Sequence, residues 1–214
     1  MIKALKDIEY IYNGRTFVLL GTGKNCAKYR DKIQKFIEKN SAVTIGMNNI
    51  TDLFIPDFHL YTSNLRYKEY GHKINNKSMK MFGCHIKKYF REKHKNHVLI
   101  KYTDRKIGEK IEYRNECIYG YFRTSGNLAI MLAHIMGAKS IYCAGYDGFT
   151  NNTDGTTHYY KDKEYELKEN KEWHDRYDIH VFNALDEMSK FIDFKIITPT
   201  IYTKHFDENI ICLS

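Results

Sequence analysis

The sequence is poor in the features that mark membrane-spanning and disulfide-stabilised proteins. It has two prolines and no apolar run that approaches the roughly 18–20 residues needed to cross a bilayer. Its five cysteines are scattered and include no Cys-x-x-Cys pair, which argues against a structural zinc site and favours reduced thiols. The first residues, MIKALKDIEYIYNG, carry charges through their apolar part, unlike a secretory signal. We therefore expect a cytoplasmic protein with at most peripheral membrane contact.

Several enzyme motifs are missing as well. No Asp-x-Asp pair occurs, so the sequence lacks the usual carboxylate clamp for a metal-bound nucleotide sugar. It has neither a GxSxG motif nor a P-loop pattern, which argues against a serine hydrolase of the nucleophile-elbow type and against a P-loop kinase. We expect no metal site.

The composition is that of a globular protein. Of the 214 residues, 43% are hydrophobic, and no internal repeat or low-complexity linker divides them, so we expect one domain over residues 1–214. The net charge is +8, and the densest basic stretch is HIKKYFREKHKNH, residues 85–97. Its spacing predicts a helix with Ile86, Tyr89 and Phe90 facing inward and lysines outward. We favour a solvated face over a binding surface there and expect no nucleic-acid partner, and we leave a homo-oligomer open.

Apolar segments typical of strands alternate with segments of helical periodicity. The predicted strands are 16–20, 42–48, 58–63, 79–83, 97–102, 140–145 and 194–198, and the predicted helices are 24–40, 85–97, 124–138 and 171–192. Residues 66–74 read as a short helix or a loop, and the polar stretch 103–116 interrupts the pattern. Such alternation predicts an α/β fold: one Rossmann-like domain with a mostly parallel sheet and helices on both faces. Ligands of such folds bind beyond the carboxyl ends of the strands.

The first loop at such a strand end is glycine-rich. Gly21, Thr22 and Gly23 follow the apolar strand FVLL and precede a helical segment. Glycines let backbone N–H groups approach a phosphate, and the helix that follows adds its positive end. A tight turn without a ligand explains the same residues, because the third glycine of the dinucleotide fingerprint is missing. The loop alone leaves the two alternatives even.

The segment FRTSGN opens the most apolar predicted helix. Thr124 or Ser125 is a natural N-cap, Gly126 allows close approach to the first turn, and Gly137 ends the helix as a C-cap would. Arg123 lies directly before the cap, where its guanidinium can hold a phosphate or a carboxylate. Plain capping next to a surface arginine explains the pattern about as well.

Amide and hydroxyl side chains follow two further strands. Asn48 and Asn49 end the second predicted strand, and Ser63 and Asn64 end the third. Amides donate and accept hydrogen bonds and so can read a base or a sugar. They are also ordinary turn residues, and that interpretation is favoured for these positions taken alone.

One histidine has the spacing of a general base. His174 and Asp178 are four residues apart on a predicted helix, so they share a face. A carboxylate one turn away can orient an imidazole and raise its basicity. In isolation, a surface histidine in an exposed first turn is the more common explanation.

The order of these segments resembles the bacterial sialyltransferase family of Campylobacter and Haemophilus type, and the wider group of DUF115 or motility-accessory-factor proteins. The likeness rests on a glycine loop, asparagines at strand ends, RTSG opening a buried helix, the strand IYCAGYDGF, a Tyr-rich loop and a helix that begins with His. It spans Phe17 to about Pro199 and is strongest from Arg123 to Asp147. Phe149 stands where the family has a tyrosine.

The resemblance implies that a CMP-sugar donor lies over the glycine loop and that neither a metal nor a separate cofactor takes part. It also implies phosphate-binding tyrosines on the loop after the later strand and a general base on a lid-like loop and helix near residues 146–180. The matching positions are Gly21, Thr22, Gly23, Asn48 or Asn49, Ser63 or Asn64, Arg123, Thr124, Ser125, Gly126 and Tyr159 or Tyr160, with His174 as the base.

Three functions follow from this resemblance. The first is a glycosyltransferase that moves a sugar, such as a nonulosonic acid, from a CMP-linked donor to a hydroxyl of a surface glycan. The second is a pterin diphosphokinase-like enzyme of the DUF115 group, which needs ATP and Mg²⁺; its candidate ligands are Asp147, in the loop after strand 140–145, and Asp154. The third is a non-catalytic sugar- or nucleotide-binding module of a polysaccharide pathway, such as one associated with an aldolase-type domain.

Overall fold

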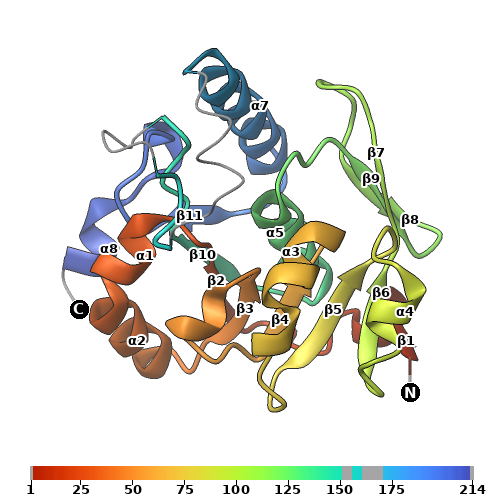
Figure 1. Cartoon of the computed structure of the whole chain (residues 1–214). Coiled ribbons are helices and arrows are strands. Elements are labelled where there is room, and N and C mark those ends of the chain that lie inside the picture. The colour runs from red at the N-terminus through yellow and green to blue at the C-terminus, as the bar shows by residue number, and fades with distance from the viewer. Residues whose placement is uncertain (1, 151–155, 161–170, 213–214) are drawn as a thin grey trace.

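The computed structural model describes residues 2–150, 156–160 and 171–212. Within these ranges, eight strands form one sheet in the order β1-β6-β5-β4-β3-β2-β10-β11, and every neighbouring pair is parallel (Figure 1). The strands are β1 (Ile2–Ala4), β2 (Thr16–Leu20), β3 (Val43–Met47), β4 (Phe58–Tyr61), β5 (Met79–Gly83), β6 (His97–Ile100), β10 (Ser140–Ala144) and β11 (Phe194–Ile196). The predicted α/β, Rossmann-like architecture is confirmed.

Helices cover both faces of this sheet. They are α1 (Lys24–Lys28), α2 (Arg30–Lys39), α3 (Asn64–Tyr70), α4 (Lys88–Arg91), α5 (Ser125–Ile135), α7 (Lys171–Ser189) and α8 (Glu208–Cys212), with short 3-10 turns at Leu5–Ile8, Ile50–Asp52, Gly71–Lys73 and Thr203–His205. In β2, Phe17 and Leu19 join the core under α5 and α7, whereas Val18 and Leu20 join the core under α2 and α8. This alternation is the period of two that a strand imposes on its side chains. Figure 1 shows α1, α2 and α8 grouped near the C-terminus.

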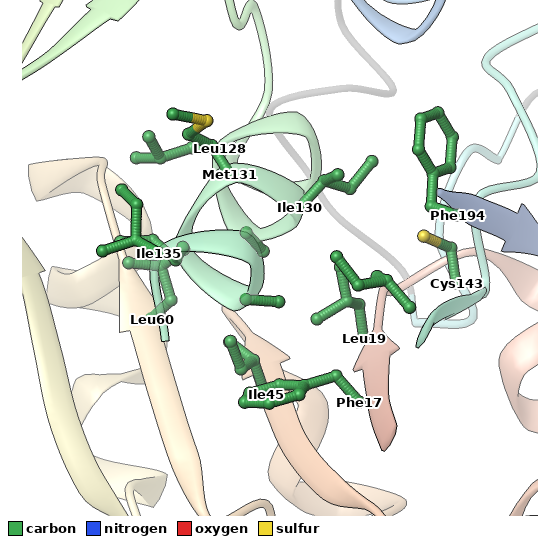
Figure 2. Packing of buried hydrophobic residues seen from close by; sticks show 14 of the residues in the cluster. Phe17, Leu19, Ile45, Leu60, Leu128, Ile130, Met131, Ile135, Cys143 and Phe194 are labelled. Atoms are coloured by element: carbon green, nitrogen blue, oxygen red, sulfur yellow. The ribbon is translucent and has the colours of Figure 1, made fainter. Parts of the chain in front are cut away.

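The central helix is α5, which was expected to be buried. Its side chains from Asn127 to Ala133 are all buried, and Leu128, Ile130, Met131 and Ile135 pack against strand residues such as Phe17, Leu19, Ile45 and Leu60 (Figure 2). Thr124 is the N-cap, as its side chain accepts a hydrogen bond of 3.2 Å from the Asn127 N–H. Gly137 has φ of 90° and ends the helix, and the N–H groups of Gly137 and Ala138 donate to the carbonyls of His134 and Ala133. This is a Schellman motif, so both predicted caps are confirmed.

The strand order reverses next to β2. From β2 the chain continues through β3, β4, β5 and β6 toward one edge, whereas β10 and β11 lie on the other side of β2. Such a switch point leaves a crevice at the carboxyl ends of the two central strands. The loops after β2 and β10 therefore face each other at that end of the sheet.

The polar stretch 103–116 interrupts the alternation of the main sheet, as the sequence pattern indicated, and it contains strands of its own. It contributes to a three-stranded sheet of β7 (Tyr102–Asp104), β9 (Cys117–Gly120) and β8 (Glu112–Arg114), in which β8 and β9 are antiparallel. Asn115 and Glu116 connect β8 to β9 with φ of 50° and 60°. Two successive residues with positive φ make the hairpin turn that matches strand twist, usually formed by Asn-Gly.

Two predicted helices differ from the observed ones. Residues 24–40 are divided into α1 and α2 at Tyr29, whose φ and ψ of −104° and 17° are not helical. The basic stretch 85–97 holds only the four residues of α4, and Tyr89 is 54% exposed instead of facing inward. The physical reason is Asn64, whose amide donates to the His85 carbonyl and accepts from the Lys87 N–H, holding this segment in a non-helical path.

Candidate functional site

A cavity of about 430 Å³ opens at the carboxyl ends of β2, β3, β4 and β10. Loops from all four strands, the start of α5 and the middle of α7 form its wall. The predicted site residues that line it are Gly21, Thr22, Gly23, Asn48, Ser63, Arg123, Thr124, Ser125, Gly126 and Asp147. Their positions in the sequence are far apart, so the parallel sheet is what brings them together.

The glycine loop packs tightly against the loop that follows β10. A Cβ atom at Gly23 would lie 2.5 Å from Asp147 Cγ and 2.6 Å from the Gly145 carbonyl oxygen. One at Gly21 would lie 2.6 Å from that same oxygen. The Gly23 N–H also donates to the Gly145 carbonyl at 3.0 Å. Close approach of protein backbone therefore explains both glycines, although the loop still borders the cavity.

Asp147 is buried in the cavity wall and is 3% exposed. Its Oδ2 accepts a hydrogen bond of 2.8 Å from the Asn25 N–H in the first turn of α1, whereas its Oδ1 is buried with no hydrogen-bond partner among the described residues. Burial raises the pKa of this carboxyl to about 6, and the bond from Asn25 opposes the rise. A carboxyl of this kind can accept a hydrogen bond from a ligand or hold a proton near neutral pH.

Arg123 has a strained backbone in the cavity wall. Its φ is 61°, and the Thr124 N–H donates to the Phe122 carbonyl at 2.7 Å, so residues 122–124 form a γ-turn of the rare form with positive φ. The side chain is exposed, and its guanidinium carbon lies 3.6 Å above the centre of the Tyr177 ring on α7. Such strain persists only where the surroundings enforce it, and it is typical of functional positions.

Ser125 begins α5 beside this turn. Its hydroxyl is 2.5 Å from the hydroxyl of Thr62, which follows β4 and also lines the cavity. The start of a long helix carries a partial positive charge and backbone N–H groups that point away from the helix. Together with Arg123, this makes one side of the cavity suitable for an anion.

Of the four amide and hydroxyl residues predicted at the two strand ends, two line the cavity and two do not. Asn48 lines the cavity with φ of 50°, and its Oδ1 is buried without a hydrogen-bond partner among the described residues. Ser63 also lines the cavity and caps α3 by accepting from the Arg66 N–H at 3.4 Å. Asn49 and Asn64 are not part of the wall. Asn49 is 2% exposed and its amide donates to Asp52, and Asn64 holds the segment before α4.

Within the described residues 156–160 of the Tyr-rich loop, His158 lines the cavity, whereas Tyr159 and Tyr160 do not. His158 lines the wall, and its Nδ1 lies 3.1 Å from the Thr22 hydroxyl. Tyr159 instead donates from its hydroxyl to the Asn49 carbonyl, and the Tyr160 ring contacts the Tyr70 ring with centroids 5.1 Å apart. Burial, with the nearby charge of Arg66, lowers the pKa of His158 to about 3. Its imidazole is therefore neutral at physiological pH.

His174 and Asp178 do not line the cavity. His174 is partly buried, with its ring centroid 6.5 Å from that of Phe149, which does line the wall. Among the described residues, the hydrogen-bond donors to the Asp178 carboxylate are the N–H groups of Phe149 and Thr150 and the hydroxyls of Thr150 and Tyr202, at 2.6–2.8 Å. Asp178 thus ties α7 to the loop after β10, and its role as the residue that orients His174 stays a prediction.

The wall also contains residues that were not predicted from the sequence, among them Thr62, Arg66, His158 and Tyr177. Each of these four is a close sequence neighbour of a predicted position. Arg66 is 6% exposed, and its guanidinium forms an ion pair with the Glu69 carboxylate at 2.9 Å. The sequence pattern, in which residues 66–74 read as a short helix or a loop, does not indicate a buried arginine. Which side chain of a loop turns inward is decided by tertiary packing, and the sequence pattern carries no signal for it.

The predicted lid falls partly on residues 151–155 and 161–170, which lie outside the described residues, as does Asp154. In the part of the chain that the structure describes, no three His, Cys, Asp or Glu side chains are grouped as metal ligands, and no helix is both long and apolar enough to cross a bilayer. Comparisons with family models and with curated proteins find no match to this chain.

Proposed function

We propose that this cavity binds a CMP-sugar and that the protein transfers the sugar to a hydroxyl of a glycan. The observation that supports this most is the joint position of Arg123 and the start of α5 at the edge of a cavity that four strand ends also border. An anionic group can bind there, while Asn48 and Asp147, which line the cavity, would supply hydrogen bonds to the neutral parts of a nucleotide or a sugar. Its size, about 430 Å³, is within the range of small-molecule sites.

The proposed reaction needs stabilisation of a leaving phosphate and removal of one proton. As the bond from the sugar to CMP breaks, negative charge grows on the phosphate, and donors already aimed at it lower the barrier. Arg123 and the α5 start would supply those donors. A base must take the proton of the acceptor hydroxyl, and His174 stays our candidate because it lies beside Phe149 at the edge of the wall. No step in this scheme is assigned to a metal.

Binding and turnover test this function separately. We expect calorimetry to show CMP binding in EDTA, with cytidine at least tenfold weaker because it lacks the phosphate. Release of CMP from a CMP-sugar should then depend on a glycan acceptor. Arg123→Ala should weaken CMP binding and leave cytidine binding unchanged, and Arg15→Ala, an exposed arginine distant from the cavity wall, is the matched control. Binding of ATP only with Mg²⁺, and no binding of CMP, would instead favour the kinase.

A non-catalytic binding module is the second candidate, and one observation favours it. The Asp178 carboxylate accepts hydrogen bonds from the N–H groups of Phe149 and Thr150 and from the Tyr202 hydroxyl, so its described contacts are those of a structural residue and not of one that orients a base. CMP binding at the wild-type cavity, combined with no turnover of any CMP-sugar tested with a panel of acceptors, would support the module.

A further inference from the structure

The turn that carries Arg123 is held from the side of α5 by a buried amide. Asn127 is fully buried, and its Nδ2 donates to the Phe122 carbonyl at 2.8 Å. The same carbonyl accepts the Thr124 N–H that closes the γ-turn. Two donors on one carbonyl fix the peptide before Arg123 and so favour the strained backbone of the turn.

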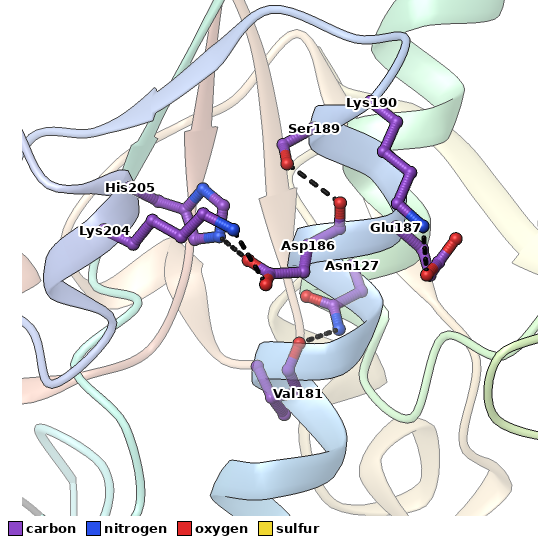
Figure 3. A network of polar contacts seen from close by, with 8 residues as sticks. All are labelled: Asn127, Val181, Asp186, Glu187, Ser189, Lys190, Lys204 and His205. Atoms are coloured by element: carbon purple, nitrogen blue, oxygen red, sulfur yellow. Dashed lines mark hydrogen bonds and ion pairs between the residues drawn. The ribbon is translucent and has the colours of Figure 1, made fainter.

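The same amide also reaches α7. Asn127 Nδ2 lies 3.4 Å from the Val181 carbonyl, a contact that Figure 3 shows between α5 and α7. Val181 is one helical turn after Tyr177, so the two share a face of α7, and both line the cavity. The Tyr177 ring in turn lies 3.6 Å beneath the Arg123 guanidinium. The contacts form a closed circuit from α5 through the turn to α7 and back.

The charge of Arg123 stays available inside this circuit. Among the described residues, Arg123 forms no ion pair with a carboxylate, although it is exposed at the cavity. A guanidinium stacked on a ring keeps its N–H edge free to bind a planar anion with two parallel hydrogen bonds. An exposed arginine otherwise loses considerable side-chain entropy when it binds, and a fixed orientation removes part of that loss.

We propose that Tyr177 and Asn127 are positioning residues: Tyr177 holds the Arg123 guanidinium flat at the cavity, Asn127 holds its strained turn, and together they prepare it for an anionic ligand group. This rests on the proposed function only in naming the ligand group as the phosphate of CMP. The consequence is selectivity, because losing either residue lowers affinity for the charged ligand and not for its neutral core.

The pair Tyr177→Leu and Tyr177→Phe tests the ring. Phenylalanine keeps the aromatic face and leucine removes it, so we expect CMP to bind about three- to thirtyfold more weakly to Tyr177→Leu, the range of a cation–π contact, and within about twofold of wild type to Tyr177→Phe. Cytidine should bind all three proteins equally in calorimetry. Equal losses for CMP and cytidine, or an unchanged CMP affinity in Tyr177→Leu, would overturn the role of Tyr177.

A readout without ligand separates this proposal from the proposed function. In NMR spectra the Arg123 side-chain resonances, assigned with Arg123→Lys, should be shifted upfield by the Tyr177 ring in wild type and Tyr177→Phe and should return toward ordinary values in Tyr177→Leu. If wild type shows this pattern but binds no CMP, the proposed function fails and the positioning stands. If the resonances have ordinary values in wild type, the positioning fails whatever binds.

Asn127→Ala tests the second residue. We expect it to lower both the melting temperature and the ratio of CMP to cytidine affinity, since the turn relaxes. To exclude a general packing effect, Ser140→Ala, at the opposite end of β10 from the cavity, serves as the control that leaves the ratio unchanged. An Asn127→Ala protein that melts lower but keeps the wild-type ratio would limit Asn127 to stability and overturn its positioning role.

Discussion

The glycine loop and the Arg123 turn border the same cavity, yet they are built in opposite ways. The glycine loop has residues without side chains because Gly145 and Asp147 occupy the space where a Cβ would be. The Arg123 turn has a long side chain on a backbone with φ of 61°, where glycine would be less strained. Small residues at the first site serve packing, whereas a large residue kept under strain at the second indicates a function for its side chain.

The largest expected effect is the loss of turnover on removal of the general base, and it tests on which side of the cavity the reaction takes place. His174 belongs to α7, on the side of Arg123, and His158 contacts Thr22 of the glycine loop. Losing a general base typically lowers a rate roughly 10²–10⁴-fold. We expect that loss in turnover for His174→Ala with CMP affinity unchanged, and less than about tenfold for His158→Ala. The reverse result in a steady-state transfer assay would move the base to the glycine-loop side.

Gly23→Val should be the most destabilising of the substitutions proposed here. The new Cβ would meet the Gly145 backbone and Asp147 within about 2.6 Å, and neither can move away easily. Overpacking of this kind costs roughly 3 kcal/mol of unfolding free energy. Gly23→Val therefore tests the packing of the fold and not ligand binding alone.

Gly108→Ala is the control for Gly23→Val. Its Cβ would meet nothing within 4 Å, so only its φ of 83° is unfavourable and the expected loss is about 1 kcal/mol. Urea unfolding measures both. Equal losses for the two variants would mean that the glycine loop is less tightly packed than its geometry indicates.

The fold was predictable because its signals are local and repeated. Seven strands of the parallel sheet follow from short apolar runs, and both caps of α5 follow from Thr124 and Gly137. The hairpin at Asn115 and Glu116 was missed because its turn lacks the glycine that usually marks it, and β1 was missed because three residues give no period.

The cavity wall was predictable to the level of loops but not of side chains. Parallel strands bring their carboxyl ends together, so Asn48 and Ser63 could be assigned to one region from sequence order alone. The sequence does not indicate that Asn48 lines the cavity in place of Asn49, or His158 in place of Tyr159. These orientations depend on contacts between distant segments, such as the hydrogen bond from the Tyr159 hydroxyl to the Asn49 carbonyl. The strain at Arg123 has no sequence signature, since any residue can precede an N-cap.

Asp147 gives a test of intermediate size, based on pH. Its pKa in the folded protein, about 6, is above the value near 3.9 of an unfolded chain, so the folded state holds the proton more tightly. The stabilisation is complete below pH 4 and is lost as the pH rises through 6. Asp147→Asn cannot ionise and so should gain about 1–3 kcal/mol relative to wild type between pH 4 and pH 7, read from chemical unfolding at several pH values. A constant difference across this range would show that Asp147 ionises normally.

The smallest expected effect is a difference in stability between two variants at Arg123, and it measures the backbone strain at this residue. Both Arg123→Ala and Arg123→Gly lose the guanidinium and should lose CMP affinity equally. With alanine, the positive φ still costs about 1–2 kcal/mol of folding free energy. Glycine avoids this cost, but its more flexible unfolded chain offsets roughly 0.5–1 kcal/mol of the gain. Arg123→Gly should therefore be about 0.5–1 kcal/mol more stable than Arg123→Ala, a rise in melting temperature of about 1–4 °C for a domain of this size.

Asn115, with φ of 50° in the hairpin, is the control, because asparagine tolerates this region and Asn115→Gly should change stability less. If Arg123→Gly is no more stable than Arg123→Ala, the turn stores no strain, and the contrast between the two sides of the cavity would rest on the Tyr177 contact alone.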